Sequence, residues 1–333
     1  MTAGSTRPPP SLGPVLASVG VLERNRTVGQ RIARVLRAAS PGEVVALESD
    51  PASLRAQLAD EPKLIASDVA DLDLLLDWSM HRYPTARLMV WSASDMTPLL
   101  EAATKHPALA SLVAFPSFQS MPRPWELLLG ARIALDSEQA VPRFSDLLGW
   151  GGTMVKYRPQ TSRERDLVVA QLTSVTENLG LGSRMAQKVA DLSHELLMNA
   201  MYDAPVDQYG EARYAHDRTC EVSLLPSETP TIRFGFDGSM LAVQVSDPFG
   251  LLRRKHVLGG VVRARRAEHE DDVSRVLDTS GGGAGLGLHR VYSSSSAVIV
   301  RVVPGSESSV TALVDVEVNP REARSMPVSL HFL

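Results

Sequence analysis

Cysteine is almost missing from this chain of 333 residues, because Cys220 is its single cysteine. An internal disulfide and a metal site built from cysteines are therefore excluded, and a reducing cytoplasm fits best. Apolar runs are short, and none approaches the roughly 20 residues that a membrane helix requires. Residues 1–10 lack the basic start and apolar stretch of a secretion signal. We therefore expect a cytoplasmic protein without membrane insertion.

The chain also lacks a large excess of either positive or negative charge. The formal net charge is −4, with 44% hydrophobic and 22% charged residues, which is ordinary for a soluble globular protein. Such a balance gives no general attraction to nucleic acid, so we expect no nucleic-acid partner. The eight histidines do not show the His-x-x-x-His spacing of a helical metal site. The length allows two ordinary domains.

The N-terminal part alternates between apolar runs and helical patterns. Residues 1–12, with three consecutive prolines, are expected to form a disordered lead. Because short crossovers of this kind place helices on both faces of a parallel sheet, we expect a five-stranded α/β domain over 13–136. The predicted strands are 15–22, 43–47, 63–67, 86–91 and 110–115, and the predicted helices are 28–39, 51–59, 72–81, 96–105 and 125–135.

Polar residues follow several of these strands. Glu23 and Arg24 follow the first, Asp68 the third, Ser92 the fourth, and Pro116 the fifth. The domain resembles the flavodoxin-like receiver domain of two-component response regulators, which implies Asp68 as the phosphoacceptor candidate. The lysine that precedes the proline in a working receiver is missing, and its charge-assisted bond is worth about 1.5–3 kcal/mol. We therefore favour a pseudo-receiver in which Asp68 is an ordinary loop acid, with Asp68 as a phosphoacceptor as the alternative.

The C-terminal part has a different order of elements. Residues 137–160 contain proline and glycine and are expected to form a linker, although 144–150 is too apolar to be a free tether. A layer of helices on a mainly antiparallel sheet then fits 161–318, as an α+β two-layer sandwich, and 319–333 is expected to be a tail. The predicted helices are 162–179 and 183–203, and the predicted strands are 219–225, 231–236, 241–246, 297–303 and 310–316.

Glu195 and Asn199 project from neighbouring turns of the 183–203 helix, beside its apolar stripe. A carboxylate and a carboxamide four residues apart can reach one small volume and hold a hydrated cation. A solvated helix edge is the ordinary alternative, since polar pairs at this spacing are common.

Two further segments carry residues suited to nucleotide binding. The 241–246 strand ends at Asp247, which Phe249 and Gly250 follow closely. The run 281–288, Gly-Gly-Gly-Ala-Gly-Leu-Gly-Leu, leads directly into a predicted helix over 286–292. Glycines let backbone N–H groups approach a phosphate, and the start of a helix adds its positive end. A flexible connection is the alternative for the glycine run.

These three segments together resemble the motifs of the GHKL ATPase superfamily, whose α/β sandwich binds ATP and Mg²⁺. The resemblance implies Asn199 as the metal ligand, Asp247 as the acceptor for the adenine amino group, and Glu195 as a catalytic base. It departs from the family where Phe249 and Leu251 replace glycines, so that a ring could pack on the nucleotide, narrow its site, or mean that the site has decayed. The expected nucleotide-binding residues are Asn199, Asp247, Phe249, Gly250, Lys255, Gly283, Gly285, Leu286 and Gly287.

The segment 251–280 corresponds to the lid of GHKL proteins and is rich in arginine and lysine. We favour a solvated helix face for this charge, and Lys255 and Arg254 are the better candidates if basic side chains contact phosphate. We expect a bacterial-type signalling protein that works as a nucleotide-dependent switch or as a serine kinase of the anti-sigma type. Its partner would be another signalling protein of the sigma or anti-sigma type or a kinase, and a homodimer is compatible with this. His194 lies inside the motif helix, which argues against an autophosphorylating histidine kinase. The alternative is a non-catalytic scaffold with two degenerate domains.

Overall fold

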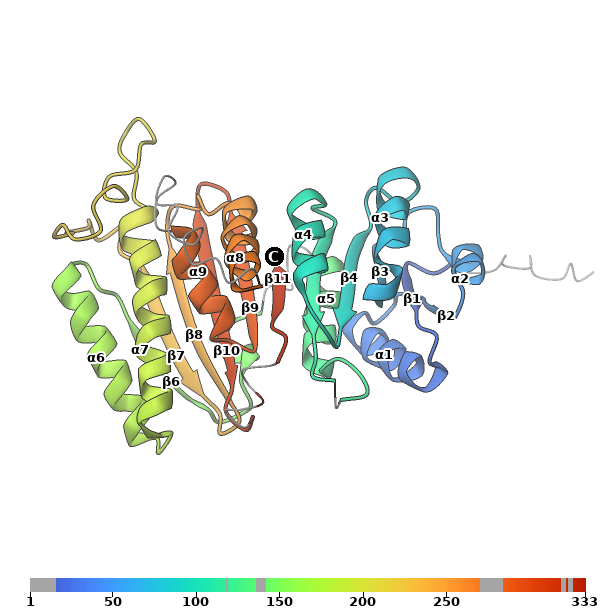
Figure 1. The fold of residues 1–333 in the computed structure, drawn as a ribbon, viewed down its shortest axis with the longest axis horizontal. Coiled ribbons are helices and arrows are strands. Elements are labelled where there is room, and N and C mark those ends of the chain that lie inside the picture. The colour runs from blue at the N-terminus through green and yellow to red at the C-terminus, as the bar shows by residue number, and fades with distance from the viewer. Residues whose placement is uncertain (1–15, 118, 136–141, 270–283, 319–321, 323–325) are drawn as a thin grey trace, which may run out of the picture.

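A computed structural model describes residues 16–117, 119–135, 142–269, 284–318, 322 and 326–333 (Figure 1). Its strands form one mixed sheet of 11 strands in the order β2-β1-β3-β4-β5-β11-β9-β10-β8-β7-β6, so the protein is α/β. The strands are β1 Val19–Leu22, β2 Val45–Glu48, β3 Leu64–Asp68, β4 Arg87–Ser92, β5 Leu109–Ala114, β6 Thr153–Tyr157, β7 Thr231–Phe236, β8 Met240–Asp247, β9 Ala297–Val303, β10 Glu307–Asp315 and β11 Ser329–Phe332.

The N-terminal half has the expected alternation. β1 to β5 are parallel, and the connecting helices are α1 Arg26–Ala39, α2 Pro51–Gln57, α3 Leu72–His81, α4 Thr97–Lys105 and α5 Pro124–Leu135. Side-chain caps fix where two of them begin. Asn25 accepts hydrogen bonds from the N–H groups of Thr27 and Val28, and Asp50 accepts one from Ser53.

In the C-terminal half, β6 to β10 are antiparallel. Helices α6 Ser162–Asn178, α7 Gly182–Met198, α8 Arg254–His269 and α9 Ala284–Ser293 lie on one face of these strands, toward the viewer in Figure 1. The Thr161 side chain caps α6 by accepting from the N–H of Glu164. None of the described helices is long and apolar enough to cross a membrane.

The two halves share one sheet because of β11, which was not predicted. This strand lies in the segment expected to be a tail, and it pairs antiparallel with β5 and parallel with β9. In Figure 1 it fills the middle of the molecule, between the two halves. The last residues of the chain therefore join two sheets that the sequence places in separate domains.

Two further differences concern strands. The predicted strand at 219–225 is wrong: this segment forms only one isolated bridge, Ser223 to Thr161. The segment with which it pairs continues into α6 at Ser162, so the pairing cannot extend into a longer ladder. Conversely, β6 was not predicted; it lies in the expected linker and pairs with β7 at the edge of the sheet.

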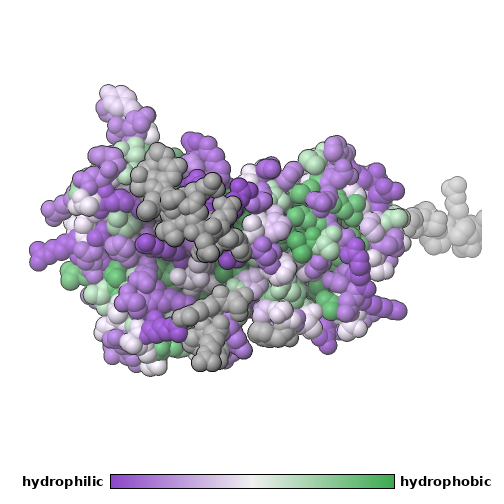
Figure 2. Space-filling model, viewed as in Figure 1, coloured by the Kyte–Doolittle hydropathy of each residue, from purple (hydrophilic) through white to green (hydrophobic). Residues whose placement is uncertain are grey.

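The hydrophobic core follows the two faces of the sheet. On one face a single cluster runs through both halves, with side chains from α3 and α4 and from α6 to α9. On the other face, α1 and α5 cover the N-terminal strands. The end of α5 and residues 144–148 cover part of the C-terminal strands. Figure 2 shows apolar surface near α3 and α4, while the C-terminal half presents mostly polar residues on that side.

Candidate functional site

Helix α7 brings the first motif to the sheet. Its apolar stripe, which includes Val189, Leu192 and Leu196, is buried in the shared core. After Met198 the chain continues as a π-helical turn, Asn199–Asp203, in which the N–H of Ala204 donates to the Asn199 carbonyl at 3.0 Å. Turns of this kind are rare and occur frequently at functional sites.

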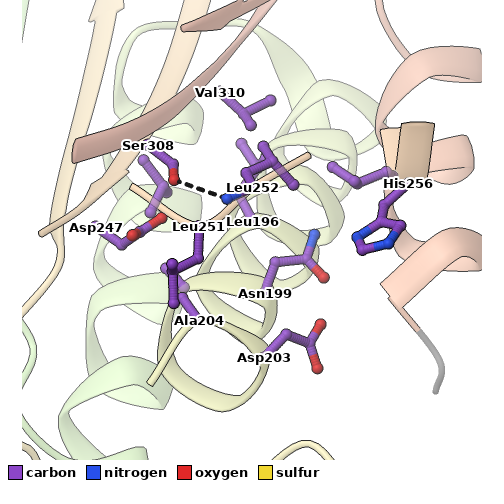
Figure 3. Close-up of a pocket in the computed structure, with 13 residues that line it drawn as sticks. Leu196, Asn199, Asp203, Ala204, Asp247, Leu251, Leu252, His256, Ser308 and Val310 are labelled. Carbon is purple, nitrogen blue, oxygen red and sulfur yellow. Dashed lines mark hydrogen bonds between the residues drawn. The ribbon is translucent and has the colours of Figure 1, made fainter. Parts of the chain in front are cut away.

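A pocket of about 130 Å³ opens beside this turn (Figure 3). Asn199 of the turn, Asp247 at the end of β8 and Leu288 of α9 all line it, so the structure brings the three predicted segments together. The remaining lining residues are mostly apolar: Leu196, Ala200, Asp203, Ala204, Val245, Leu251, Leu252, His256, Ser308 and Val310. Figure 3 shows Asn199 and Asp203 pointing to the same side, toward His256.

The Asn199 carboxamide has an unusual environment. Both its oxygen and its nitrogen are buried, and neither has a hydrogen-bond partner among the described residues. A buried polar group without a partner costs about 1–3 kcal/mol. Such groups are rare, and each calls for an explanation, of which an unseen ligand or ion is one.

Asp247 supplies a carboxylate in a mostly apolar pocket. Burial raises the pKa of Asp247 to about 6, although hydrogen bonds from the N–H groups of Phe249 and Gly250 and from the Ser308 hydroxyl act in the opposite direction. The Phe249 N–H donates to Asp247 Oδ1 at 3.0 Å. Near neutral pH the carboxylate is mainly ionised and can accept a hydrogen bond from a ligand.

Phe249 and Gly250 do not themselves line the pocket. The Phe249 ring is half-buried and does not fill the cavity. Gly250 has φ +63°, and a Cβ there would lie 2.2 Å from the Val303 carbonyl oxygen. The glycine is therefore needed for a close approach between the β8 end and the β9–β10 turn, whereas a contact of either residue with a nucleotide remains a prediction.

Glu195 lies between α7 and α9. A Cβ on Gly287 would be 2.6 Å from Glu195 Oε2 and 3.7 Å from Asn199 Oδ1, so the glycine backbone packs directly against both motif side chains. Arg290, one turn further along α9, donates from Nη1 to Glu195 Oε1 at 2.7 Å. Arg290 is largely exposed and Glu195 is mostly covered. Two residues of α9 thus fix the Glu195 carboxylate, Arg290 through its charge and Gly287 through close contact.

The other predicted nucleotide-binding residues are placed less fully. Gly283 lies outside the described residues, and for Gly285 and Leu286 the structure describes only that they belong to the first turn of α9. Lys255 is exposed on α8 and does not line the pocket. Arg254 turns away from the pocket and donates to the carbonyl oxygens of Pro107 and Leu109 in the N-terminal half.

Sequence reasoning missed two titratable residues of the pocket, Asp203 and His256. Burial raises the pKa of Asp203, Arg218 lowers it through an ion pair, and Glu195 raises it further. Burial and the neighbouring cations Lys255 and Arg253 lower the pKa of His256. The spacing of Asp203, four residues after Asn199, was a usable signal. No local pattern singles out His256, because its place depends on how α8 packs.

The predicted phosphoacceptor region lies at the C-terminal edge of the N-terminal strands. Asp68 Oδ1 accepts a hydrogen bond from the Ala70 N–H at 2.9 Å and so caps a short helical turn. Nearby, Arg24 makes two hydrogen bonds to buried Asp71, at 2.6 and 2.7 Å. Arg24 therefore neutralises the carboxylate of Asp71. Among the described residues, no group of three acidic, histidine or cysteine side chains could hold a metal ion.

Comparison with models of known protein families and with curated proteins gave no match.

Proposed function

We propose that the protein binds ATP with Mg²⁺ in the pocket between α7, α9 and the end of β8, and acts as a nucleotide-dependent switch or as a protein serine kinase on a signalling partner. The single observation that carries this proposal is the meeting of Asn199, Asp247 and Gly287, which come from three segments distant in sequence. The layout supports a GHKL-type fold for the C-terminal half. The strand order β2-β1-β3-β4-β5 supports a flavodoxin-like fold for the N-terminal half.

The pocket chemistry fits a purine base and a bound cation. The walls are apolar, including Leu196, Val245 and Val310, and Asp247 can accept a hydrogen bond from an exocyclic amino group. The unpaired Asn199 oxygen is a suitable ligand for Mg²⁺, which usually takes few protein ligands and completes its shell with phosphates and water. Bound Mg²⁺ and ATP would supply a γ-phosphoryl group for transfer.

The chain itself would contribute the remaining parts of the reaction. The α9 backbone near Gly287 would face phosphate with its N–H groups at a helix N-terminus. Arg290 donates to Glu195 Oε1 at 2.7 Å and holds the carboxylate in place, so Oε2 is the oxygen that could accept a proton from a hydroxyl nucleophile.

A calorimetric titration tests the proposal. ATP added with Mg²⁺ at pH 7.5 is expected to bind saturably to one site, and GTP much more weakly, because the guanine carbonyl would face the Asp247 carboxylate. A parallel assay with γ-labelled ATP would separate a kinase from a switch. Saturable ATP binding without transfer indicates the switch, whereas the absence of saturable ATP binding refutes the proposal.

A non-catalytic scaffold is the second candidate, and specific contacts favour it. The ion pair of Arg24 with Asp71 neutralises an acid beside Asp68, and Phe249 and Leu251 stand where glycines are expected. If Asp68 accepts phosphate from a small donor, acetyl phosphate should add the mass of one phosphoryl group. This addition should disappear in the Asp68→Asn variant. No mass increase would support a pseudo-receiver.

A further inference from the structure

Helix α8, which forms part of the pocket wall, also contacts the N-terminal half. Leu252, just before α8, and His256 in its first turn both line the pocket. Arg254, between them in sequence, extends to the other half. Its Nη1 donates to the Pro107 carbonyl at 3.1 Å, and its Nη2 donates to the Leu109 carbonyl. One turn of helix therefore serves the pocket on one side and the junction on the other.

The Arg254 guanidinium is built into this junction. It lies over the ring of Phe332 in β11, 4.2 Å from the ring centroid. Burial, with a contribution from Arg87, lowers the pKa of Arg254 to about 10, so the side chain stays charged at neutral pH. A partly buried charge is stabilised by the partners that remain in place. Displacing α8 from the N-terminal half would remove both carbonyl partners of Arg254 together.

Two further contacts join the same elements. Arg266, three turns further along α8, donates to Glu101 Oε1 of α4 at 2.8 and 2.6 Å. On α9, the buried Tyr292 hydroxyl donates to the Val328 carbonyl at 2.8 Å, just before β11. Asp95, in the loop before α4, adds to the upward shift that burial produces in the pKa of Tyr292. Helices α8 and α9, which both border the pocket, therefore contact the N-terminal half or β11.

We propose that Arg254 is a positioning residue through which the N-terminal half sets the affinity of the pocket for nucleotide. This inference rests on the proposed function. The wall formed by Leu252 and His256 is complete only while α8 is docked, so the apparent dissociation constant rises as the docked fraction falls. Linkage also requires the reverse effect, in which bound nucleotide strengthens docking of α8 on α4. A signal that shifts α4 would thereby change nucleotide binding without touching the nucleotide.

Calorimetric titration with ATP and Mg²⁺ tests this on the full chain. The Arg254→Ala variant should bind between about 5-fold and 150-fold more weakly than the unmodified protein, the range usual for coupled sites. Arg254→Lys should recover part of the affinity, since it keeps the charge but loses the second hydrogen bond. Arg263→Ala is the matched control, because Arg263 is an exposed arginine on the same helix.

A charge exchange between the halves gives a second, independent test. Glu101→Arg or Arg266→Glu alone places like charges opposite each other and should weaken nucleotide binding by about two- to fivefold, as expected for an exposed pair. Combining both changes should restore the affinity. Glu101 and Arg266 do not line the pocket, so such a rescue would not come from direct contact with nucleotide.

The outcomes separate the inference from the function on which it rests. If the unmodified protein does not bind ATP, the proposed function fails. If it binds, and Arg254→Ala lowers the melting temperature but leaves the dissociation constant unchanged below the unfolding range, Arg254 is only structural. That result, or single charge changes without effect on binding, would overturn the inference.

Discussion

At the scale of single residues, substitution of Asn199 should change nucleotide binding and protein stability in different directions. The Asn199→Ala variant should lose about 10- to 150-fold in affinity for ATP with Mg²⁺, the equivalent of one strong polar contact. Its melting temperature without ligand should stay the same or rise, because the substitution removes buried polar atoms that have no partner among the described residues. Calorimetry and thermal unfolding measure the two effects. A variant that binds normally but is less stable would show that the carboxamide is structural.

The raised pKa of Asp247 predicts how the affinity for ATP depends on pH. Since burial raises the pKa of Asp247 to about 6, the ionised form that accepts from an amino group is lost as the pH falls through that value. ATP affinity should therefore fall about tenfold between pH 7.5 and pH 5, and protons should be released on binding at the lower pH. Asp247→Asn should bind more weakly and lose this dependence. A flat profile for the unmodified protein would contradict a role for Asp247 in base recognition.

At the scale of elements, the contact between α7 and α9 depends on Gly287. A Cβ there would lie 2.6 Å from Glu195 Oε2, which is the far end of a flexible side chain. The Gly287→Ala variant should therefore fold with little loss of stability, about 1 kcal/mol or less because alanine favours helix, while Glu195 is displaced from Arg290. ATP binding and any phosphoryl transfer should fall. Gly259→Ala on α8, where a Cβ meets only the Arg263 side chain at 3.9 Å, is the control.

Much of the secondary structure and the meeting of the three motif segments could be predicted from the sequence. The α7 stripe and the alternation of the N-terminal half follow from local periodicity. What could not be predicted depends on contacts between distant segments. β11 has four residues, and it forms a strand because it pairs with the edge strands β5 and β9 of the two halves. The position of His256 likewise follows from how α8 docks.

The segment at 219–225 shows the limit of local pattern in the other direction. Its apolar and β-branched residues favour a strand, and Val222 and Leu224 are indeed buried. They pack in a small cluster with Met198 and Tyr202 near the π-helical turn instead of joining the sheet. Burial was therefore predictable here, and strand pairing was not.

At the scale of the whole molecule, the junction of the two halves contains buried titratable groups. Glu126 of α5 accepts hydrogen bonds from Arg123 and from Ser329 of β11, and His331 Nε2 lies 3.9 Å from its carboxyl group. Burial raises the pKa of Glu126 to about 7 and lowers that of His331 to about 4. The histidine is therefore neutral at pH 7, and this contact is not an ion pair.

These shifts predict the pH dependence of stability. The raised pKa of Glu126 contributes stability that is complete below pH 4.5 and lost as the pH rises through about 7. The lowered pKa of His331 contributes stability that is present above pH 6.5 and lost as the pH falls through about 4. The Glu126 contribution therefore falls by about 3 kcal/mol between pH 4.5 and pH 7, while the His331 contribution rises by a similar amount between pH 4 and pH 6.5, so we expect the two to nearly cancel in the unmodified protein.

Melting temperatures measured between pH 4 and pH 9 test this dependence. Glu126→Gln should remove the Glu126 contribution, because the amide remains neutral and can still accept from Arg123, so the stability of the variant should rise by about 3 kcal/mol relative to that of the unmodified protein between pH 4.5 and pH 7. Glu61→Gln, at an exposed position, should leave the profile unchanged. Parallel profiles for Glu126→Gln and the unmodified protein would contradict a raised pKa of Glu126.

The central claim is that segments distant in sequence form one nucleotide pocket. Hydrogen exchange followed by mass spectrometry, with and without ATP and Mg²⁺, measures this directly. We expect slower exchange on ligand addition in residues 195–204, 245–252 and 284–288 together, and in the first turn of α8, with little change at β1 and β2. Protection limited to one of these segments, or no protection at saturating ATP, would contradict the account.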